Sequence, residues 1–188
     1  MYPLYSNLVR LRDGLRSRSD RLVLAESCTA GLVAAELGQI PGISEFLCGS
    51  MVVYRPPTKT AWLGISTAIL ENPEIGPVSA QVTTALAEAI LAKTPEATIA
   101  AAITGHLGPG SPSGLDGHVF CSFVRRGDAD STTKCQAYQL ASPPPADGED
   151  LPRRSARQKE AVGLLLSFIQ ESIDPKLLAN QREGKAPG

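Results

Sequence analysis

The chain has 188 residues, 43% of them hydrophobic, which suits one domain with a substantial core. Its 18 basic and 19 acidic residues nearly cancel, and this balance argues against a protein that binds nucleic acid or a membrane surface. No apolar run is long enough to cross a bilayer, and arginines interrupt the N-terminal segment where a signal peptide would need an apolar centre. We therefore expect a cytoplasmic protein.

The N-terminal half alternates helical and extended patterns. Leucines spaced by four, three and four residues between Leu4 and Leu15 predict an amphipathic helix. The apolar run 21–25 predicts a first strand, and 29–39 predicts the helix that follows it. The nearly continuous apolar run 46–54 predicts a second strand in the centre of the sheet. A short helix should open at Pro56-Pro57, where proline fits a helix start, and carry Lys59.

The C-terminal half completes the pattern after a stretch, 65–78, that is expected to be mostly loop. The predicted elements are a helix capped by Ser79, a strand over 98–103, hairpin strands over 119–124 and 133–140 that turn at 126–128, and a helix over 151–173. This order predicts an α/β fold, a single-domain three-layer α/β/α sandwich with a mixed, mostly parallel sheet. Residues 174–188 are polar and aperiodic, so we expect a flexible C-terminal tail.

The four cysteines indicate free thiols. Cys28, Cys48, Cys121 and Cys135 form no C-x-x-C pair, and three of them lie in apolar, strand-like runs. Buried thiols in a reducing compartment are therefore expected. The two histidines lie in or beside a single loop, and their spacing from the cysteines does not match a structural zinc site.

Ser27 is the strongest candidate for chemistry, because it lies where a strand turns into a helix. Parallel strands would bring this turn to one sheet edge together with Tyr54, Lys59 and the Thr104-Gly105 pair. A lysine whose pKa is lowered by burial can take the proton of a serine nucleophile, and a tyrosine can relay it or orient the lysine. Backbone N–H groups at the following helix start, or those of Gly105, can bind the oxyanion.

Each of these residues also has a purely structural interpretation. Ser27 can be a helix cap, Tyr54 can end its strand with the hydroxyl in water, and Lys59 can be a solvated helix charge. Arginines clustered in the first turns of the last helix can be a solvated face, although they would suit an anion at the positive end of that helix better. Arg153, Arg154 and Arg157 form this cluster.

The segment 25–31, AESCTAG, resembles the A-E-S-C-T-[GA]-G motif of the CinA C-terminal domain family, the nicotinamide-nucleotide amidohydrolases, also called NMN deamidases or PncC. The resemblance extends over about residues 5–172. It includes the tyrosine and lysine spaced 27 and then 5 residues after the serine, and the Gly108-Pro109 loop. Residues 1–173 would then be one CinA C-terminal-like amidohydrolase domain.

The resemblance implies hydrolysis of the carboxamide of nicotinamide mononucleotide to nicotinic acid mononucleotide and ammonia, without metal or cofactor. It implies Ser27 as nucleophile, activated by Lys59 and Tyr54. The implied partner is a small pyridine nucleotide, not a nucleic acid or a membrane, and a homodimer is expected. The implied substrate-binding residues are Thr29, Thr104, Gly105, Gly108, Arg153 and Arg157. The last two lie one helical turn apart and are expected to clamp the phosphate.

Three segments depart from the family pattern near the expected pocket. Tyr54-Arg55-Pro56 replaces Tyr-Ser-Asn, and histidines occupy positions 106 and 118. Two alternatives therefore remain. One is a Ser-His or Cys-His hydrolase in which Cys28 or Ser27 works with a histidine, with Asp116 near in sequence. The other is a nucleotide-binding or regulatory protein without turnover.

Overall fold

Five strands form one mixed sheet in the described part of the computed structural model, residues 3–127, 133–144 and 151–174. The spatial order is β2-β1-β3-β4-β5. The β2–β1 and β1–β3 pairs are parallel, whereas β3–β4 and β4–β5 are antiparallel. The carboxyl ends of the first three strands therefore reach one edge. The strands are β1 (Leu22–Glu26), β2 (Leu47–Val52), β3 (Ile99–Gly105), β4 (His118–Arg125) and β5 (Lys134–Gln139).

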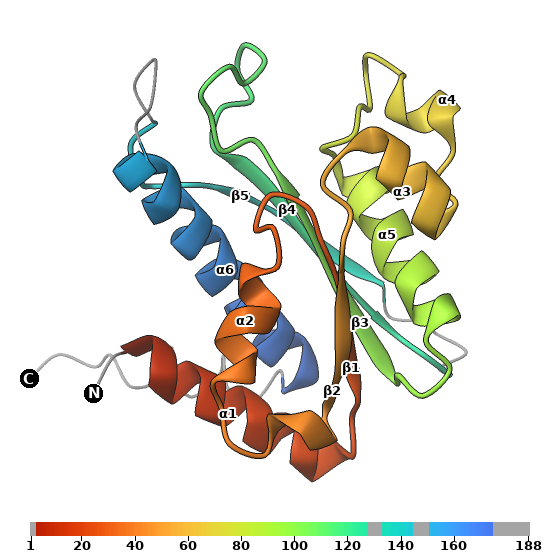
Figure 1. Cartoon of the computed structure of the whole chain (residues 1–188), viewed down its shortest axis with the longest axis vertical. Coiled ribbons are helices and arrows are strands. Elements are labelled where there is room, and N and C mark those ends of the chain that lie inside the picture. The colour runs from red at the N-terminus through yellow and green to blue at the C-terminus, as the bar shows by residue number, and fades with distance from the viewer. Residues whose placement is uncertain (1–2, 128–132, 145–150, 175–188) are drawn as a thin grey trace, which may run out of the picture.

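Helices cover both faces of this sheet, which confirms the predicted three-layer α/β sandwich (Figure 1). One layer contains α1 (Pro3–Arg18), α2 (Leu32–Gly38) and α6 (Leu151–Ile173), with a short 3-10 helix at Ile43–Glu45. The other contains α3 (Pro56–Leu63), α4 (Thr67–Leu70) and α5 (Ala80–Lys93). Among the described helices, none is long and apolar enough to cross a membrane.

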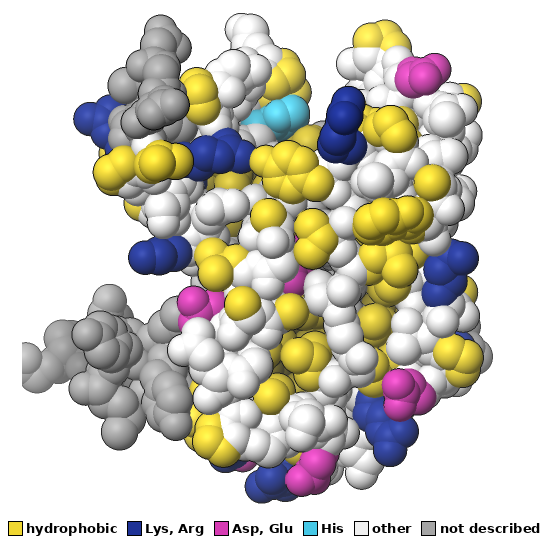
Figure 2. All heavy atoms as spheres, in the orientation of Figure 1, with side chains coloured by type: hydrophobic (Ala, Val, Ile, Leu, Met, Phe, Trp, Pro, Cys, Tyr) yellow, Lys and Arg dark blue, Asp and Glu magenta, His cyan; other side chains and the backbone are white. Residues whose placement is uncertain are grey.

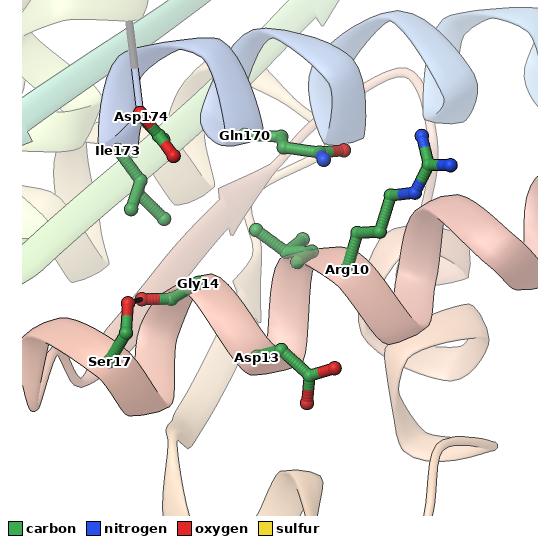
Figure 3. A pocket seen from close by; sticks show the side chains of 8 residues that line it. Arg10, Asp13, Gly14, Ser17, Gln170, Ile173 and Asp174 are labelled. Carbon is green, nitrogen blue, oxygen red and sulfur yellow. Dashed lines mark hydrogen bonds between the residues drawn. The ribbon is translucent and has the colours of Figure 1, made fainter. Parts of the chain in front are cut away.

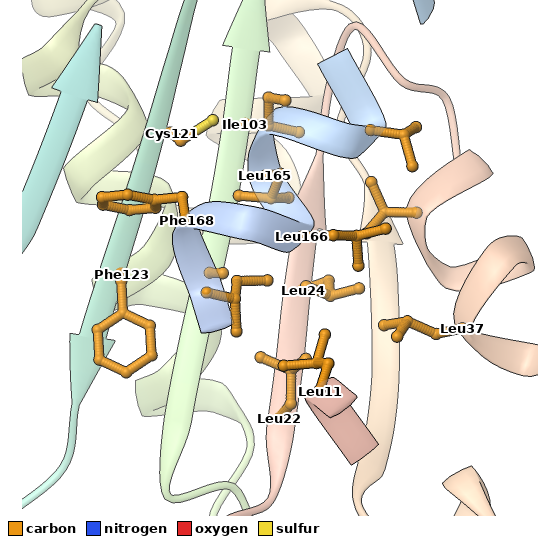
Figure 4. Packing of buried hydrophobic residues seen from close by; sticks show 14 of the residues in the cluster. Leu11, Leu22, Leu24, Leu37, Ile103, Cys121, Phe123, Leu165, Leu166 and Phe168 are labelled. Atoms are coloured by element: carbon orange, nitrogen blue, oxygen red, sulfur yellow. The ribbon is translucent and has the colours of Figure 1, made fainter. Parts of the chain in front are cut away.

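Alternation along β1 explains why its sequence is apolar throughout. Leu22 and Leu24 point into the cluster formed with α1, α2 and α6, and Val23 and Ala25 point into the cluster under α5. Figure 4 shows Leu24 among the side chains that α1 and α6 contribute to the first cluster. Each fully buried aliphatic side chain contributes about 1.5–3 kcal/mol to folding. A strand buried on both faces reads as a continuous hydrophobic run, as predicted.

The structure corrects three details. Strand β2 lies at the edge of the sheet, not in its centre. Its apolar run is explained by packing on its two faces, where Leu47 joins one cluster and Met51 the other. Cys135 is exposed, because β5 forms the opposite edge. The predicted loop 65–78 contains α4. Part of the hairpin turn, at Asp128, and all of the tail after 174 lie outside the described residues.

Local signals in the sequence account for several helix ends. The Ser79 hydroxyl accepts a hydrogen bond from the Val82 N–H at 3.2 Å and caps α5 as predicted. Gly64 ends α3 with a φ of 71°, a left-handed conformation that glycine adopts without a Cβ penalty. Helix α2 starts later than predicted, at Leu32. The residues before it form an irregular turn in which Ala30 and Gly31 have positive φ values.

A cavity of about 270 Å³ lies between α1 and the C-terminal end of α6 (Figure 3). Arg10, Asp13 and Ser17 of α1 face Gln170 and Asp174 across it. Because the N-terminal end of α6 reaches the carboxyl edge of the parallel strands, this cavity belongs to the opposite part of the molecule from Ser27.

Candidate active site

The candidate active site forms where β1, β2 and β3 end. Ser27 follows β1 directly, Val53 to Lys59 follow β2, and Thr104-Gly105 closes β3. The segment that leads into β4 and the start of α6 border the same edge (Figure 1). The space-filling view shows a notch at this end of the molecule, with basic side chains and a histidine at its sides (Figure 2). The topology thus brings together segments that are far apart in sequence.

Ser27 and Lys59 are in direct contact. The Lys59 ammonium donates to the Ser27 hydroxyl oxygen at 2.9 Å and to the Val53 carbonyl oxygen at 2.6 Å. Both side chains are buried, and the lysine is only 1% exposed. Lysine is rarely buried without a partner, so this placement excludes the interpretation of Lys59 as a solvated helix charge.

Burial lowers the pKa of Lys59 from 10.5 to about 8, because the charged ammonium loses its hydration. The nearby Cys28 thiol has the opposite, smaller effect. With a pKa near 8, roughly a tenth of the lysine side chains would be neutral at pH 7. A neutral amine 2.9 Å from a hydroxyl can accept its proton, which is the geometry that a general base needs.

Glu26 lies on the other face of β1 and was not predicted as a site residue. Its carboxylate is fully buried and accepts hydrogen bonds from three backbone N–H groups and two hydroxyls. The donors are Gly31 N, Val33 N, Ala34 N, Thr29 Oγ1 and Ser50 Oγ, at 2.8–3.0 Å. The N–H groups that begin α2 are therefore already occupied, contrary to their expected role as oxyanion donors. The available sequence signal was a charged residue placed directly after the apolar run 21–25.

Tyr54 lies at the rim of the site, with 48% of its surface exposed. Its hydroxyl accepts a hydrogen bond from Arg154 at 2.8 Å, and no hydrogen bond links it to Lys59 or Ser27 in the described residues. Arg154 also donates to the Gly108 carbonyl oxygen. One guanidinium therefore joins α6 to the end of β2 and to the loop after β3. Sequence reasoning placed Arg154 in the arginine cluster but did not select it for the site.

Two predicted substrate-binding hydroxyls are engaged inside the protein. The Thr29 hydroxyl donates to Glu26 at 2.8 Å, and the Thr104 hydroxyl lies 2.7 Å from that of Thr83. Both threonines are almost completely buried. Gly105 has a steric role, because an added Cβ would come within 2.8 Å of Val119 and 3.1 Å of the Cys28 sulfur.

The two arginines expected to clamp a phosphate do not act as a pair. Arg157 is 2% exposed and donates two hydrogen bonds, of 2.9 and 2.8 Å, to the carboxylate of Asp116. Its Nε donates to the Ser142 carbonyl oxygen at 3.1 Å. This pairing lowers the pKa of Asp116. Arg153 is exposed and donates to the Pro144 carbonyl oxygen at 3.4 Å. Arg157 thus ties the loop before β4 to α6.

The cysteine and histidine alternatives find no support in this geometry. Burial raises the pKa of the Cys28 thiol to about 12, so it stays protonated at neutral pH. Burial lowers the pKa of His106, and its backbone N–H donates to the His118 carbonyl oxygen. Among the described side chains, neither histidine donates to or accepts from Ser27. In the same part of the chain, no three His, Cys, Asp or Glu side chains gather as a metal site requires.

Comparison with solved structures supports the fold. The crystal structure of a competence/damage-inducible protein from Agrobacterium tumefaciens is 26% identical, covers 89% of this chain and 97% of its own, and superposes with a TM-score of 0.71. A CinA superfamily protein from Klebsiella pneumoniae superposes with a TM-score of 0.77 over 92% of this chain and 98% of its own, at 24% identity, and shows likeness of fold alone.

Sequence comparison identifies the family. A CinA-like protein from Myxococcus xanthus is 35% identical over 130 residues, which are 68% of this chain and 30% of that protein. Another from Mycobacterium avium is 36% identical over 157 residues, 81% of this chain and 34% of that protein. The chain thus spans about a third of the length of these curated relatives. The family model of the CinA C-terminal domain matches residues 6–142, and this chain therefore belongs to that family.

Proposed function

We propose that this protein is a serine amidohydrolase that converts nicotinamide mononucleotide to nicotinic acid mononucleotide and ammonia. The observation that carries the proposal is the buried Lys59 amine 2.9 Å from the Ser27 hydroxyl, with a pKa lowered to about 8. A serine hydroxyl is a weak nucleophile until an adjacent base takes its proton, and Lys59 is the base in contact with it. The proposed substrate rests on family membership.

In the first step the Ser27 Oγ attacks the carboxamide carbon while Lys59 takes the hydroxyl proton. The carbonyl electron pair moves to oxygen and gives a tetrahedral oxyanion. The carbon–nitrogen bond then breaks, and Lys59 passes its proton to the leaving nitrogen, which departs as ammonia. An ester between Ser27 and the pyridine carbonyl remains.

In the second step water attacks this ester with Lys59 again as the base. The carbon–Oγ bond breaks, and the Ser27 oxygen regains its proton from Lys59. The balance is one carboxamide and one water consumed, with one carboxylic acid and one ammonia formed. No cofactor takes part.

The oxyanion would bind the backbone N–H groups of Cys28 and Thr29. In the described residues neither group donates to another residue, whereas the N–H of Ser27 donates to the Ile103 carbonyl oxygen and that of Ala30 to the Ser27 carbonyl oxygen. Backbone amides directly after a nucleophile that pair with no other described residue are suited to stabilising the charge that develops on the carbonyl oxygen.

Arg154 would meet the substrate phosphate in place of the expected Arg153 and Arg157 pair. It lies beside Tyr54 at the rim of the site, whereas the guanidinium of Arg157 is already hydrogen-bonded to the Asp116 carboxylate. Replacing Arg154 with alanine should weaken use of the mononucleotide by about 1.5–3 kcal/mol, the range for hydrogen bonds to charged groups. Nicotinamide riboside, which lacks the phosphate, should be affected much less. Arg153→Ala serves as the control, and equal losses on both substrates would contradict this assignment.

The decisive experiment measures ammonia release by purified protein with nicotinamide mononucleotide, nicotinamide riboside and nicotinamide. We expect release from the mononucleotide, loss of release in Ser27→Ala and Lys59→Arg, and retained release in Cys28→Ala and His106→Ala. Lysine and arginine are both cationic, but arginine cannot lose its proton in a protein, so Lys59→Arg separates a base from a mere charge. Saturable binding without turnover would instead indicate a non-enzymatic nucleotide-binding protein, and loss in His106→Ala would indicate a histidine base.

A further inference from the structure

Glu26 is a buried charge that the proposed reaction does not use. Its side chain shares a sheet face with Leu22 and Leu24, so it points toward α2, whereas the next residue, Ser27, reaches Lys59 on the α3 side. A buried, unpaired carboxylate would cost several kcal/mol, but five donors compensate this one.

These five hydrogen bonds hold the segment that follows the nucleophile. Three come from the backbone of 31–34, one from Thr29 and one from Ser50 on the neighbouring strand. The carboxylate thus links the strand that delivers Ser27, the turn after it and β2. Because Lys59 follows β2, the same contacts relate the nucleophile to the strand that leads to its base.

The turn under this carboxylate is conformationally costly. Ala30 has a φ of 54° and Gly31 a φ of 95°. A non-glycine residue in the left-handed region costs about 1–2 kcal/mol and persists only where surrounding contacts determine it. The Gly31 N–H donates to Glu26 at 3.0 Å, and the Ala30 N–H donates to the Ser27 carbonyl oxygen at 3.1 Å. The carboxylate thus supplies one of the contacts that hold the turn in this left-handed conformation.

We propose that Glu26 is a positioning residue that fixes the Ser27 hydroxyl against Lys59 and aims the backbone amides of Cys28 and Thr29. This inference rests on the proposed function, in which Ser27 is the nucleophile. Glu26 does not touch substrate, because it is fully buried on the far side of β1. All of its effect on reactivity passes through the turn.

The test is the rate at which a fluorophosphonate probe phosphonylates the Ser27 hydroxyl, with loss of fluoride, in Glu26→Gln. The amide keeps the shape of the carboxylate, but its NH2 group is a donor that would face the existing donors. A displacement of about 1 Å at a reacting centre can cost about a hundredfold in rate. We therefore expect the phosphonylation rate, and kcat for the mononucleotide, to fall at least tenfold, with KM nearly unchanged. Circular dichroism at the assay temperature must show that the variant is folded.

Two further variants separate positioning from general damage. Ser50→Ala removes one of the five donors and leaves the carboxylate in place, so it should change the phosphonylation rate less than threefold. Glu26→Asp keeps the charge but has a side chain one methylene shorter. If Glu26→Gln does not fold, the same rate is measured on Glu26→Asp instead. The pH midpoint of phosphonylation should be the same in wild type and in the Glu26 variants, because Glu26 acts on position and not on the charge of Lys59.

The possible outcomes separate this inference from the proposed function. If wild type is labelled at Ser27 and the folded Glu26 variants are labelled equally fast, the positioning role is overturned while the nucleophile stands. If the pH midpoint of the probe reaction differs between wild type and the Glu26 variants, the positioning role is overturned, because Glu26 would then act on the charge of Lys59. If wild-type Ser27 does not react, both proposals fall, since there is no nucleophile to position.

Discussion

Replacing Lys59 with methionine should remove a pH dependence of stability that the wild-type protein carries. The unfolded lysine has a pKa of 10.5 and the folded one about 8, so the unfolded state binds more protons between these values. The free energy of unfolding therefore rises with pH across this window. Below pH 8 the wild type bears the full cost of burying a charge, about 3 kcal/mol from the pKa difference. Above pH 10.5 that cost is gone.

Methionine fills a similar volume without a charge, so Lys59→Met escapes this cost but loses the hydrogen bond to the Val53 carbonyl, a loss of about 1–3 kcal/mol. These opposing effects make the stability change at one pH a poor test. The change of this difference with pH is a sharper test, because it depends only on the folded and unfolded pKa values of Lys59. From the two pKa values, the stability of the variant relative to wild type should fall by about 2 kcal/mol between pH 7 and pH 9.5.

Urea unfolding followed by circular dichroism measures both proteins at both pH values. Lys93→Met, which removes an exposed lysine from the last turn of α5, is the matched control for the loss of one positive charge. Lys59→Met should also be inactive, while Lys93→Met should keep wild-type turnover. A stability difference between Lys59→Met and wild type that does not change with pH would refute the lowered pKa, and with it the support for Lys59 as a base.

Three further predictions concern the surroundings of this pair. Arg157→Ala should lower the free energy of unfolding by about 2–3 kcal/mol, since it removes charged hydrogen bonds. It should also make the free energy of unfolding depend less on pH in the acid range. In wild type the pKa of Asp116 is lowered in the folded state, so the ionised carboxylate stabilises the fold above its unfolded pKa of 3.8. This stabilisation is lost as the pH falls through the folded pKa, and the variant would lack it. Urea unfolding between pH 3 and 6 measures the difference. Gly105→Ala should destabilise by about 1–3 kcal/mol through overpacking and should slow turnover by displacing Cys28, as thermal unfolding and ammonia release would show. Tyr54→Phe should reduce kcat far less than Lys59→Met, because its hydroxyl contacts an arginine; an equal loss would assign Tyr54 a direct role in proton transfer.

The elements and the Ser27–Lys59 pair were predictable because they depend on local pattern and one topological rule. Apolar runs of strand length alternate with helical periodicity, and parallel strands bring their carboxyl ends to one edge. A serine after the first strand and a lysine after the second must then lie near each other. Burial of the lysine was only a condition of the base role, because the sequence alone also allowed a solvated helix charge.

The partners of charged residues were not predictable in the same way. Arg157 and Asp116 are 41 positions apart, and only the path of the loop before β4 brings them together. Helical spacing placed Arg153 and Arg157 on one face but could not show that one of them is buried against a carboxylate. The edge position of β2 was also missed. An apolar run indicates that both faces of a strand are covered, but it does not indicate whether the strand pairs with one neighbouring strand or with two.

The short contact between the Lys59 nitrogen and the Val53 carbonyl oxygen affects how many groups the proposed catalytic unit contains. A neutral amine has two protons and one lone pair. With one proton held by this carbonyl at 2.6 Å, the lone pair can turn toward the Ser27 hydroxyl. The carbonyl then orients the base as an aspartate orients the histidine of a serine protease triad. Here the third member belongs to the main chain, so alanine scanning would detect a dyad where three groups act.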